Sequence, residues 1–419
     1  NGLCMKQHYD IVIIGGGMVG ASLACALLPM SDALDLNIAV IESVALPTHD
    51  VEEYQPSYDA RSTALAYGSR SIYEAMGVWT RLKAHVSPIS DIHVSDKGHF
   101  GVTRLNAKKE GVSALGYVVE NQWLGHVLLD HLQQAASPRI DFICPASVTA
   151  VESRADSMGV TVEYQGEHTE LSCELVVMAD GGRSPLRASM GISYSETTYD
   201  QHAIVVNVST DQPHNGVAYE RFTDSGPMAL LPLEDKDGSP RSALVWTVPN
   251  DLIDEVLGLD DQAFIARFHE RFGYRAGNVI HVGQRFSYPL KLTVADEQVR
   301  RGLVVLGNAA HALHPIAGQG YNLALRGVAS LAETLIHARK QQQNLGDLTR
   351  LQAFYEQQRL DQVRTIGFSD QTMKLFSNHN PLLAVGRNVG LQLLDICPTA
   401  KTLFARSAMG LDMPAPDLK

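Results

Sequence analysis

The sequence has little of what disulfide-stabilised, zinc-binding and nucleic-acid-binding proteins require. Its 419 residues include five cysteines, which are odd in number, scattered, and form no CxxC pair. This predicts reduced thiols in a cytoplasmic protein, without a disulfide framework or a zinc site. No run of Lys and Arg stands out and the net charge is −12, so a nucleic acid would bind against the overall field and we expect no such partner.

Long hydrophobic runs are also scarce. Residues 11–30 carry no charge over 20 positions, which is the length that a bilayer requires. Three successive glycines, Gly15 to Gly17, would weaken a spanning helix at its start. We therefore expect a cytoplasmic protein, with peripheral attachment to a membrane as the alternative.

A strand, a glycine turn, a helix and a second strand are predicted at the N-terminus. Tyr9–Ile14 is a short apolar run that ends in glycines, as in a buried parallel strand. Met18–Leu28 is rich in helix formers and is expected to end before Pro29, and Asn37–Glu42 is a second apolar run that closes on an acid. Together these segments predict a βαβ unit.

The rest of the chain alternates between parallel and antiparallel patterns. Leu171–Ala179 and Gly302–Leu306 resemble buried strands, whereas residues 203–249 alternate as in an antiparallel sheet. Helices are predicted from Ser62 toward Trp79, from Asn121 to about Ala136, and from Gln319 onward. Because parallel units flank the antiparallel block, we expect an α/β fold with one discontinuous domain, an inserted second domain and a helical C-terminal region. The predicted boundaries are 5–75, 100–180 and 295–345 for the first domain, 76–99 and 185–294 for the second, and 346–419 for the C-terminal region.

The first motif with chemical meaning is Gly15-x-Gly17-x-x-Gly20, followed 22 residues later by Glu42. Gly15 permits a tight turn, Gly17 lets the backbone approach a pyrophosphate, and Gly20 lets the helix pack on the strand. Glu42 is placed to accept a hydrogen bond from a ribose hydroxyl. A GxGxxG alone is a weak signal, but the strand–helix–strand setting and the terminal acid indicate dinucleotide binding.

Two further motifs follow predicted strands. One is Asp180-Gly181-x-x-Ser184-x-x-Arg187, and the other runs from Gly307-Asn308 through His311 and Pro315 to Gly318-Gln319-Gly320-Tyr321-Asn322 at the start of a long helix. Free N–H groups at a helix start would stabilise the negative charge of a reduced flavin. The glycines would let the backbone approach its ring.

The three motifs together resemble those of the flavoprotein aromatic hydroxylases, the family typified by p-hydroxybenzoate hydroxylase. Within this family the chain is most similar to the ubiquinone-biosynthesis branch, the 2-octaprenyl-6-methoxyphenol hydroxylases in particular. Stretches that carry this likeness include Val118-Val119-Glu120, Glu220-Arg221-Phe222-Thr223 and residues 307–326. The resemblance implies a Rossmann-like FAD-binding domain with an inserted antiparallel substrate domain. It also implies non-covalent FAD, NAD(P)H as a transient co-substrate, and hydroxylation of a prenylated phenol by O₂ through a flavin C4a-hydroperoxide.

The resemblance also implies roles for individual residues. The ADP half of FAD would be held by Gly15, Gly17, Gly20 and Glu42. The ribityl or pyrophosphate region would meet Asn308, at a position where relatives usually have Asp. The isoalloxazine would lie against Gly318, Gln319, Gly320 and Asn322. Asp180 and Gly181 would serve FAD and NAD(P)H. Arg61 would lie near the flavin, although a surface ion pair is its alternative.

The family chemistry requires no amino-acid nucleophile, so the catalytic candidates are weak ones: Arg61, His311 and Pro315. The spacing of His311 and His314 could suggest a metal, but no third ligand is visible and we expect none. Met228, Leu230 and Leu231 are candidates for a substrate pocket. Residues 383–409 either pack on the body or dock on other ubiquinone-biosynthesis proteins or the membrane surface. Two rival functions are a flavin oxidoreductase that inserts no oxygen and an FAD-holding scaffold subunit.

Overall fold

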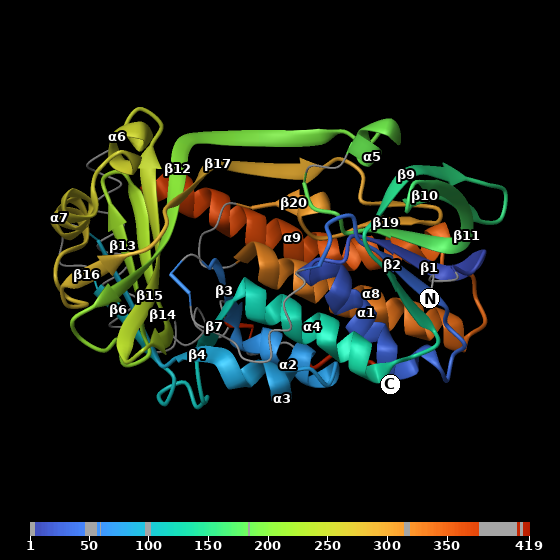
Figure 1. Cartoon of the computed structure of the whole chain (residues 1–419), viewed down its shortest axis with the longest axis horizontal. Coiled ribbons are helices and arrows are strands. Elements are labelled where there is room, and N and C mark those ends of the chain that lie inside the picture. Colours follow the sequence, from blue (N-terminus) through green and yellow to red (C-terminus); the bar gives the residue numbers. More distant parts are fainter. Residues whose placement is uncertain are drawn as a thin grey trace.

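The computed structural model describes residues 5–46, 57–58, 60–96, 102–182, 185–313, 319–376, 409–410 and 414–419. Two large sheets lie toward opposite ends of the long axis, and helices pack against both (Figure 1). The elements that line the space between the sheets are the ones that build the candidate site.

The first sheet is centred on the N-terminal strand β1. Strand β1 pairs in parallel with β2 on one side and with β11 on the other, as the N-terminal βαβ prediction requires. All but the first residue of β1 are buried, which explains its unbroken apolar sequence. The strands of this sheet are β1 (His8–Ile14), β2 (Ile38–Ile41), β8 (Ile140–Ile143), β9 (Ala146–Ser153), β10 (Met158–Tyr164), β11 (Glu167–Met178), β18 (Val299–Arg300) and β19 (Leu303–Val305). Since they come from three distant parts of the chain, this domain is discontinuous, as expected.

Three helices share a hydrophobic core with one face of the first sheet: α1 (Met18–Ser31), α4 (Asn121–Ala135) and α8 (Gln319–Lys340). The apolar run 11–30 is thus divided between β1 and α1 and does not form one helix. The expected end of α1 before Pro29 is wrong, because the helix continues through Pro29 to Ser31. Pro29 lies within the last turn, where it removes one backbone hydrogen bond, to the carbonyl four residues earlier, and only two helical residues follow it.

The second sheet is mainly antiparallel. Its strands are β5 (Asp91–Asp96), β6 (Val102–Asn106), β12 (Tyr194–Thr210), β13 (Val217–Thr223), β14 (Gly226–Lys236), β15 (Ser239–Pro249), β16 (Val279–Val282), β17 (Phe286–Ala295) and β20 (His311–Ala312). Long strands β12 and β17 extend from the first sheet's side to the second (Figure 1). Helices α6 (Ile253–Leu257) and α7 (Asp261–Phe272) cover the outer face of this sheet, and the predicted antiparallel block is confirmed.

A small third sheet, of β3 (Ser62–Ala66), β4 (Val86–Ile89) and β7 (Gly116–Glu120), connects the two. The helix predicted to start at Ser62 is wrong in its first residues. Residues 62–66 form strand β3, and helix α2 (Tyr67–Ala75) begins only at Tyr67. The reason is pairing with β7, in which Ser62 lies opposite Glu120 and Leu65 opposite Tyr117. Tertiary pairing here overrides a local helix signal. The short α3 (Trp79–Leu82), η1 (Lys83–His85), α5 (Pro185–Ser189) and η2 (Gly307–Ala309) complete the connections.

Helix α9 (Leu348–Phe376) follows α8, as the helical C-terminal prediction requires. Of the predicted docking region 383–409, only Met409 is among the described residues, and it is buried in a cluster with Ile89 and Val118. No helix among the described residues is long and apolar enough to span a bilayer. The domain boundaries given above stay a prediction, and we note that β6 at Val102–Asn106 belongs to the second sheet.

Candidate active site

The turn between β1 and α1 has the geometry of a phosphate-binding loop. Gly15 has φ +103°, and a Cβ there would lie 2.4 Å from the carbonyl oxygen of Ala179. A Cβ at Gly20 would lie 1.8 Å from the carbonyl oxygen of Gly15, so helix and turn are in direct backbone contact. A Cβ at Gly17, by contrast, would meet nothing within 4 Å. Gly17 is the N-cap of α1 and has no side-chain capping bond, which leaves the first N–H groups of the helix available to an anion.

Glu42 lies just after β2, on the same cavity as the glycine turn. Its Oε2 accepts a 2.7 Å hydrogen bond from the Gly16 backbone N–H, and its Oε1 accepts one of 2.7 Å from Val44. These bonds fix the direction of the carboxylate. A carboxylate has about four acceptor positions, so Glu42 retains capacity for a ribose hydroxyl.

Asp180 and Gly181 follow β11 and also line the cavity. Gly181 has φ +76°, a conformation that favours glycine. The Asp180 carboxylate lies 3.5 Å from the Arg187 guanidinium, which is buried and stacked over the Tyr194 ring at 5.5 Å. The first and last residues of this second motif are therefore joined in one ion pair.

The third motif divides between the cavity and the protein interior. Asn308 in η2 is exposed and lines the cavity, and Gly320 at the start of α8 lines it too. Asn322 does not line the cavity, so it is not placed to lie against the isoalloxazine, as was expected. Its side-chain amide is buried and bonds Ala64 O, Ala66 N and Ser69 Oγ at 2.6–2.9 Å. Asn322 thus ties α8 to β3 and α2, which fixes the helix start beside the cavity.

None of the other candidate side chains of this motif that the structure describes lies in the cavity. Pro315 and Gly318 lie outside the described residues, as does His314, and for Gln319 only the backbone is described, as the first residue of α8. His311 is buried in β20 and does not line the cavity. Burial lowers the pKa of His311 to about 4, so the ring is neutral at pH 7. A neutral buried ring is suited to packing more than to proton relay.

Arg61 lies just before β3, lines the cavity and contacts the second sheet. Its Nη1 donates a 3.0 Å hydrogen bond to the Tyr288 hydroxyl on β17, and its backbone oxygen accepts one of 2.9 Å from Asn121. The bond to Tyr288 is not the surface ion pair that was its alternative. Tyr288 was missed in the sequence, where nothing marks this tyrosine in β17 as different from its neighbours.

One cavity of about 980 Å³ between the first and second sheets is lined by the candidates Gly15, Gly17, Glu42, Arg61, Asp180, Gly181, Asn308 and Gly320. Its wall on the second sheet is apolar, with Val205, Val245 and Ala229 paired across three adjacent strands and Leu231 beside them. The pocket assignment of Leu231 is supported, but that of Met228 and Leu230 is wrong. Alternate residues of a strand point to opposite faces, and these two lie in the core under α7.

The fold and cavity define a flavoprotein in which a dinucleotide-binding domain and an antiparallel domain enclose one site. The chain matches the family described as FAD binding domain over residues 8–366, and it belongs to that family. A Rhodospirillum rubrum protein named ubiquinone hydroxylase UbiL is 35% identical over 407 residues, 96% of this chain and 89% of that protein. The 3-demethoxyubiquinol 3-hydroxylase of Escherichia coli is 30% identical over 407 residues, 97% and 100% of the two chains.

Among solved structures, p-nitrophenol 4-monooxygenase PnpA of Pseudomonas putida shares the fold. Its TM-score is 0.76 at 19% identity, with 97% of this chain and 98% of that chain covered. The family and these relatives confirm the resemblance drawn from the motifs. FAD is the cofactor, and the protein is an FAD-dependent monooxygenase.

Proposed function

We propose that this protein hydroxylates the aromatic ring of a polyprenylated phenol in ubiquinone biosynthesis, with NAD(P)H and O₂ as co-substrates. The observation that carries the proposal is the single cavity, which joins the glycine turn to an apolar wall on the second sheet. Relatives named as ubiquinone-pathway hydroxylases align with nearly the whole chain. This extends the likeness beyond the nucleotide-binding part to the wall that would contact the ring.

The cavity residues fit FAD along its length. Gly17 leaves open space where the pyrophosphate would approach the N-terminus of α1, and Glu42 lies where a ribose hydroxyl would need an acceptor. Asn308 offers both a donor and an acceptor to the middle of the cofactor. Gly320 lies at the beginning of α8 and lines the cavity, so the first N–H groups of this helix would stabilise negative charge on the reduced ring.

When bound, FAD would supply the redox chemistry, in which NAD(P)H is the reductant, one oxygen atom of O₂ enters the ring and the other is released as water. This chain's share is binding, orientation and exclusion of water. The apolar wall of Val205, Ala229, Leu231 and Val245 would hold an aromatic ring. Asp180 and Gly181, at the end of β11, would serve both FAD and the transient NAD(P)H.

The substrate is the finer part of the proposal. The residues quoted above resemble those of the 2-octaprenyl-6-methoxyphenol hydroxylases, whereas the Escherichia coli relative is named 3-demethoxyubiquinol 3-hydroxylase. Partners through residues 383–409, either pathway proteins or the membrane surface, remain part of this proposal.

The test is to supply prenylated phenols of each substitution pattern to the purified holoprotein with NADH or NADPH in air. We expect one phenol to gain a single oxygen atom, identified by mass, with one nicotinamide oxidised per product. Nicotinamide oxidation without oxygenated product would instead indicate a flavin oxidoreductase. Bound flavin without turnover on any phenol would favour the scaffold subunit.

A further inference from the structure

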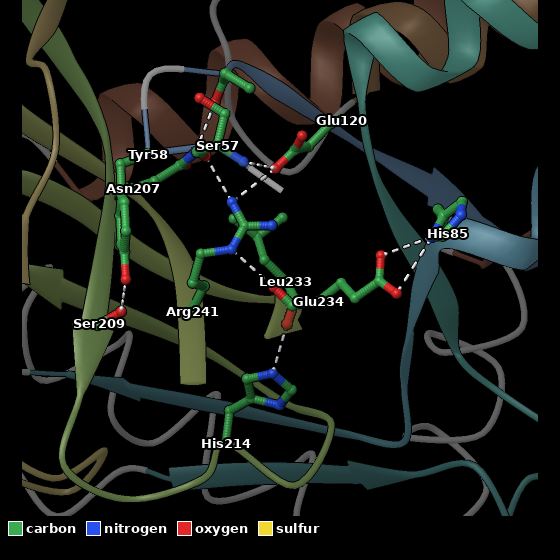
Figure 2. A network of polar contacts seen from close by, with 11 residues as sticks. Ser57, Tyr58, His85, Glu120, Asn207, Ser209, His214, Leu233, Glu234 and Arg241 are labelled. Atoms are coloured by element: carbon green, nitrogen blue, oxygen red, sulfur yellow. Dashed lines mark hydrogen bonds and ion pairs between the residues drawn. The ribbon is translucent and has the colours of Figure 1, made fainter. Parts of the chain in front are cut away.

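A buried ion pair joins the second sheet to the small third sheet. Arg241 lies on β15 and Glu120 ends β7, and the guanidinium Nη1 lies 2.7 Å from the carboxylate Oε1 (Figure 2). Their side chains are 0% and 1% exposed. The two charges therefore interact without access to bulk water.

The pair meets on the segment that precedes Arg61. Arg241 Nη1 also donates a 2.6 Å hydrogen bond to the carbonyl oxygen of Ser57. Asn207 on β12 donates from its Nδ2 to Ser57 O at 3.0 Å and to Ala60 O at 2.7 Å, and Figure 2 shows these groups around Ser57. Two side chains of the second sheet thus hold the backbone immediately before Arg61.

The Glu120 side of the pair leads to Arg61 as well. The next residue, Asn121, donates its backbone N–H to Arg61 O at 2.9 Å and accepts a 2.6 Å bond from the Thr63 hydroxyl at its side chain. Arg61, Asn121 and Tyr288 all line the cavity. Arg61 is consequently fixed on both sides of its backbone by groups attached to the ion pair.

Stability alone does not explain a charged pair at this place. Burying two charges costs desolvation that their attraction seldom exceeds, and apolar replacements of buried pairs are often neutral or stabilising. Moreover, Glu120 Oε2 and Arg241 Nη2 have no hydrogen-bond partner in the described part of the chain. What the pair supplies is direction, because the planar guanidinium donates in fixed directions, from Nη1 to Glu120 and Ser57 and from Nε to the backbone oxygen of Glu234.

We propose that the buried Arg241–Glu120 pair is a positioning device that, with Asn207, holds the backbone at Ser57 and Ala60 and so directs Arg61 into the cofactor cavity. It couples the second sheet, which carries the apolar wall, to Arg61, which lines the same cavity. The inference rests on the proposed function only in that Arg61 faces bound FAD or NAD(P)H. It does not depend on which phenol is hydroxylated.

The test compares three proteins with wild type: Arg61→Ala, the apolar double variant Arg241→Met/Glu120→Leu, and the triple variant. The readouts are the FAD dissociation constant by fluorescence quenching, the visible circular dichroism of bound flavin, and KM for NAD(P)H against kcat. We expect Arg61→Ala and the double variant to change the same constant, either the FAD dissociation constant or KM for NAD(P)H, by about tenfold each. The triple variant should match Arg61→Ala, because the pair acts through that side chain.

A control variant comes from the same network. Glu234→Gln removes the charge that contacts His85 at 3.0 Å (Figure 2), while the backbone oxygen of residue 234 still accepts from Arg241 Nε. It should leave every readout at the wild-type value. If the double variant folds poorly, Arg241→Lys keeps the charge without the planar fork, and a partial change in the same readout is expected.

Three results would overturn the proposal. One is an Arg61→Ala protein with wild-type constants and flavin spectrum. Another is a triple variant whose effects are the product of the separate changes. The third is a folded double variant that behaves as wild type. Absence of phenol hydroxylation in all proteins, with the flavin readouts changing as expected, would refute the proposed substrate and leave the positioning role standing.

Discussion

Gly17→Val is expected to separate cofactor binding from folding. The backbone of Gly17 has φ −70° and ψ −170°, which every residue adopts, and its Cβ would project into open space. Placing valine at this N-cap should cost the apoprotein only about 1 kcal/mol. The same side chain would occupy the space that a pyrophosphate needs in order to reach the N–H groups of α1.

The expected loss in FAD affinity follows from those N–H groups. Hydrogen bonds to a charged acceptor contribute about 1.5–3 kcal/mol each, so losing one or two weakens FAD binding by roughly 10-fold to 10⁴-fold. The protein should then purify without its yellow colour. Titration of apoprotein with FAD, followed by fluorescence quenching, measures the constant directly, and a urea unfolding curve measures stability on the same preparation.

Two matched variants complete the comparison. Gly17→Ala should weaken FAD binding less than valine does, because its side chain is smaller. Gly20→Ala should instead lower the free energy of unfolding, since its Cβ would lie 1.8 Å from Gly15 O. Wild-type flavin content in Gly17→Val would refute our reading of the turn. So would a loss of FAD that is explained entirely by unfolding.

Three further predictions concern other parts of the site. Asn308→Asp should retain FAD but lower its reduction potential modestly, because a carboxylate at this exposed cavity position disfavours anionic reduced flavin. Spectroelectrochemistry measures this potential. A folded variant that binds no FAD would show that the role given to Asn308 is wrong. Ala229→Leu should raise KM for a prenylated phenol with an unchanged FAD constant, and an unchanged KM would exclude this wall from the substrate site. His311 has its pKa lowered from 6.5 to about 4 by burial, so its contribution to stability is full above pH 6.5 and falls as the pH drops toward 4. His311→Gln should therefore reduce the loss of stability between pH 7.5 and 5, which is about 2 kcal/mol for this group, and equal acid sensitivity in urea unfolding would contradict the assignment.

The parts of the fold that could be predicted from the sequence are those fixed by nearby residues. The roles of Gly15 and Gly20 depend on one turn and its adjacent strand, so the glycine pattern alone reveals them. Strand β3 could not be read in the same way. Residues 62–66 contain a capping serine and helix-forming alanines, and their strand conformation comes from β7, about 50 residues later. Hydrogen bonding to a distant partner leaves no local pattern to detect.

The site likewise contains groups that can be predicted from the local sequence and groups that cannot, and this difference has a physical cause. A phosphate or a flavin ring is met by backbone N–H groups in glycine-rich turns, and such turns have short, recognisable sequences. The groups that set distances between turns are buried polar side chains from remote strands, such as Asn322 bonded to β3 and Arg241 bonded to Ser57. A buried polar residue is determined by the partners that satisfy it, and in a sheet those partners can come from any strand. One arginine in β15 is therefore indistinguishable in sequence from a solvent-exposed arginine. Its importance follows only from the three-dimensional contact with Glu120, which is why the structure adds the positioning of Arg61 to what the motifs predict.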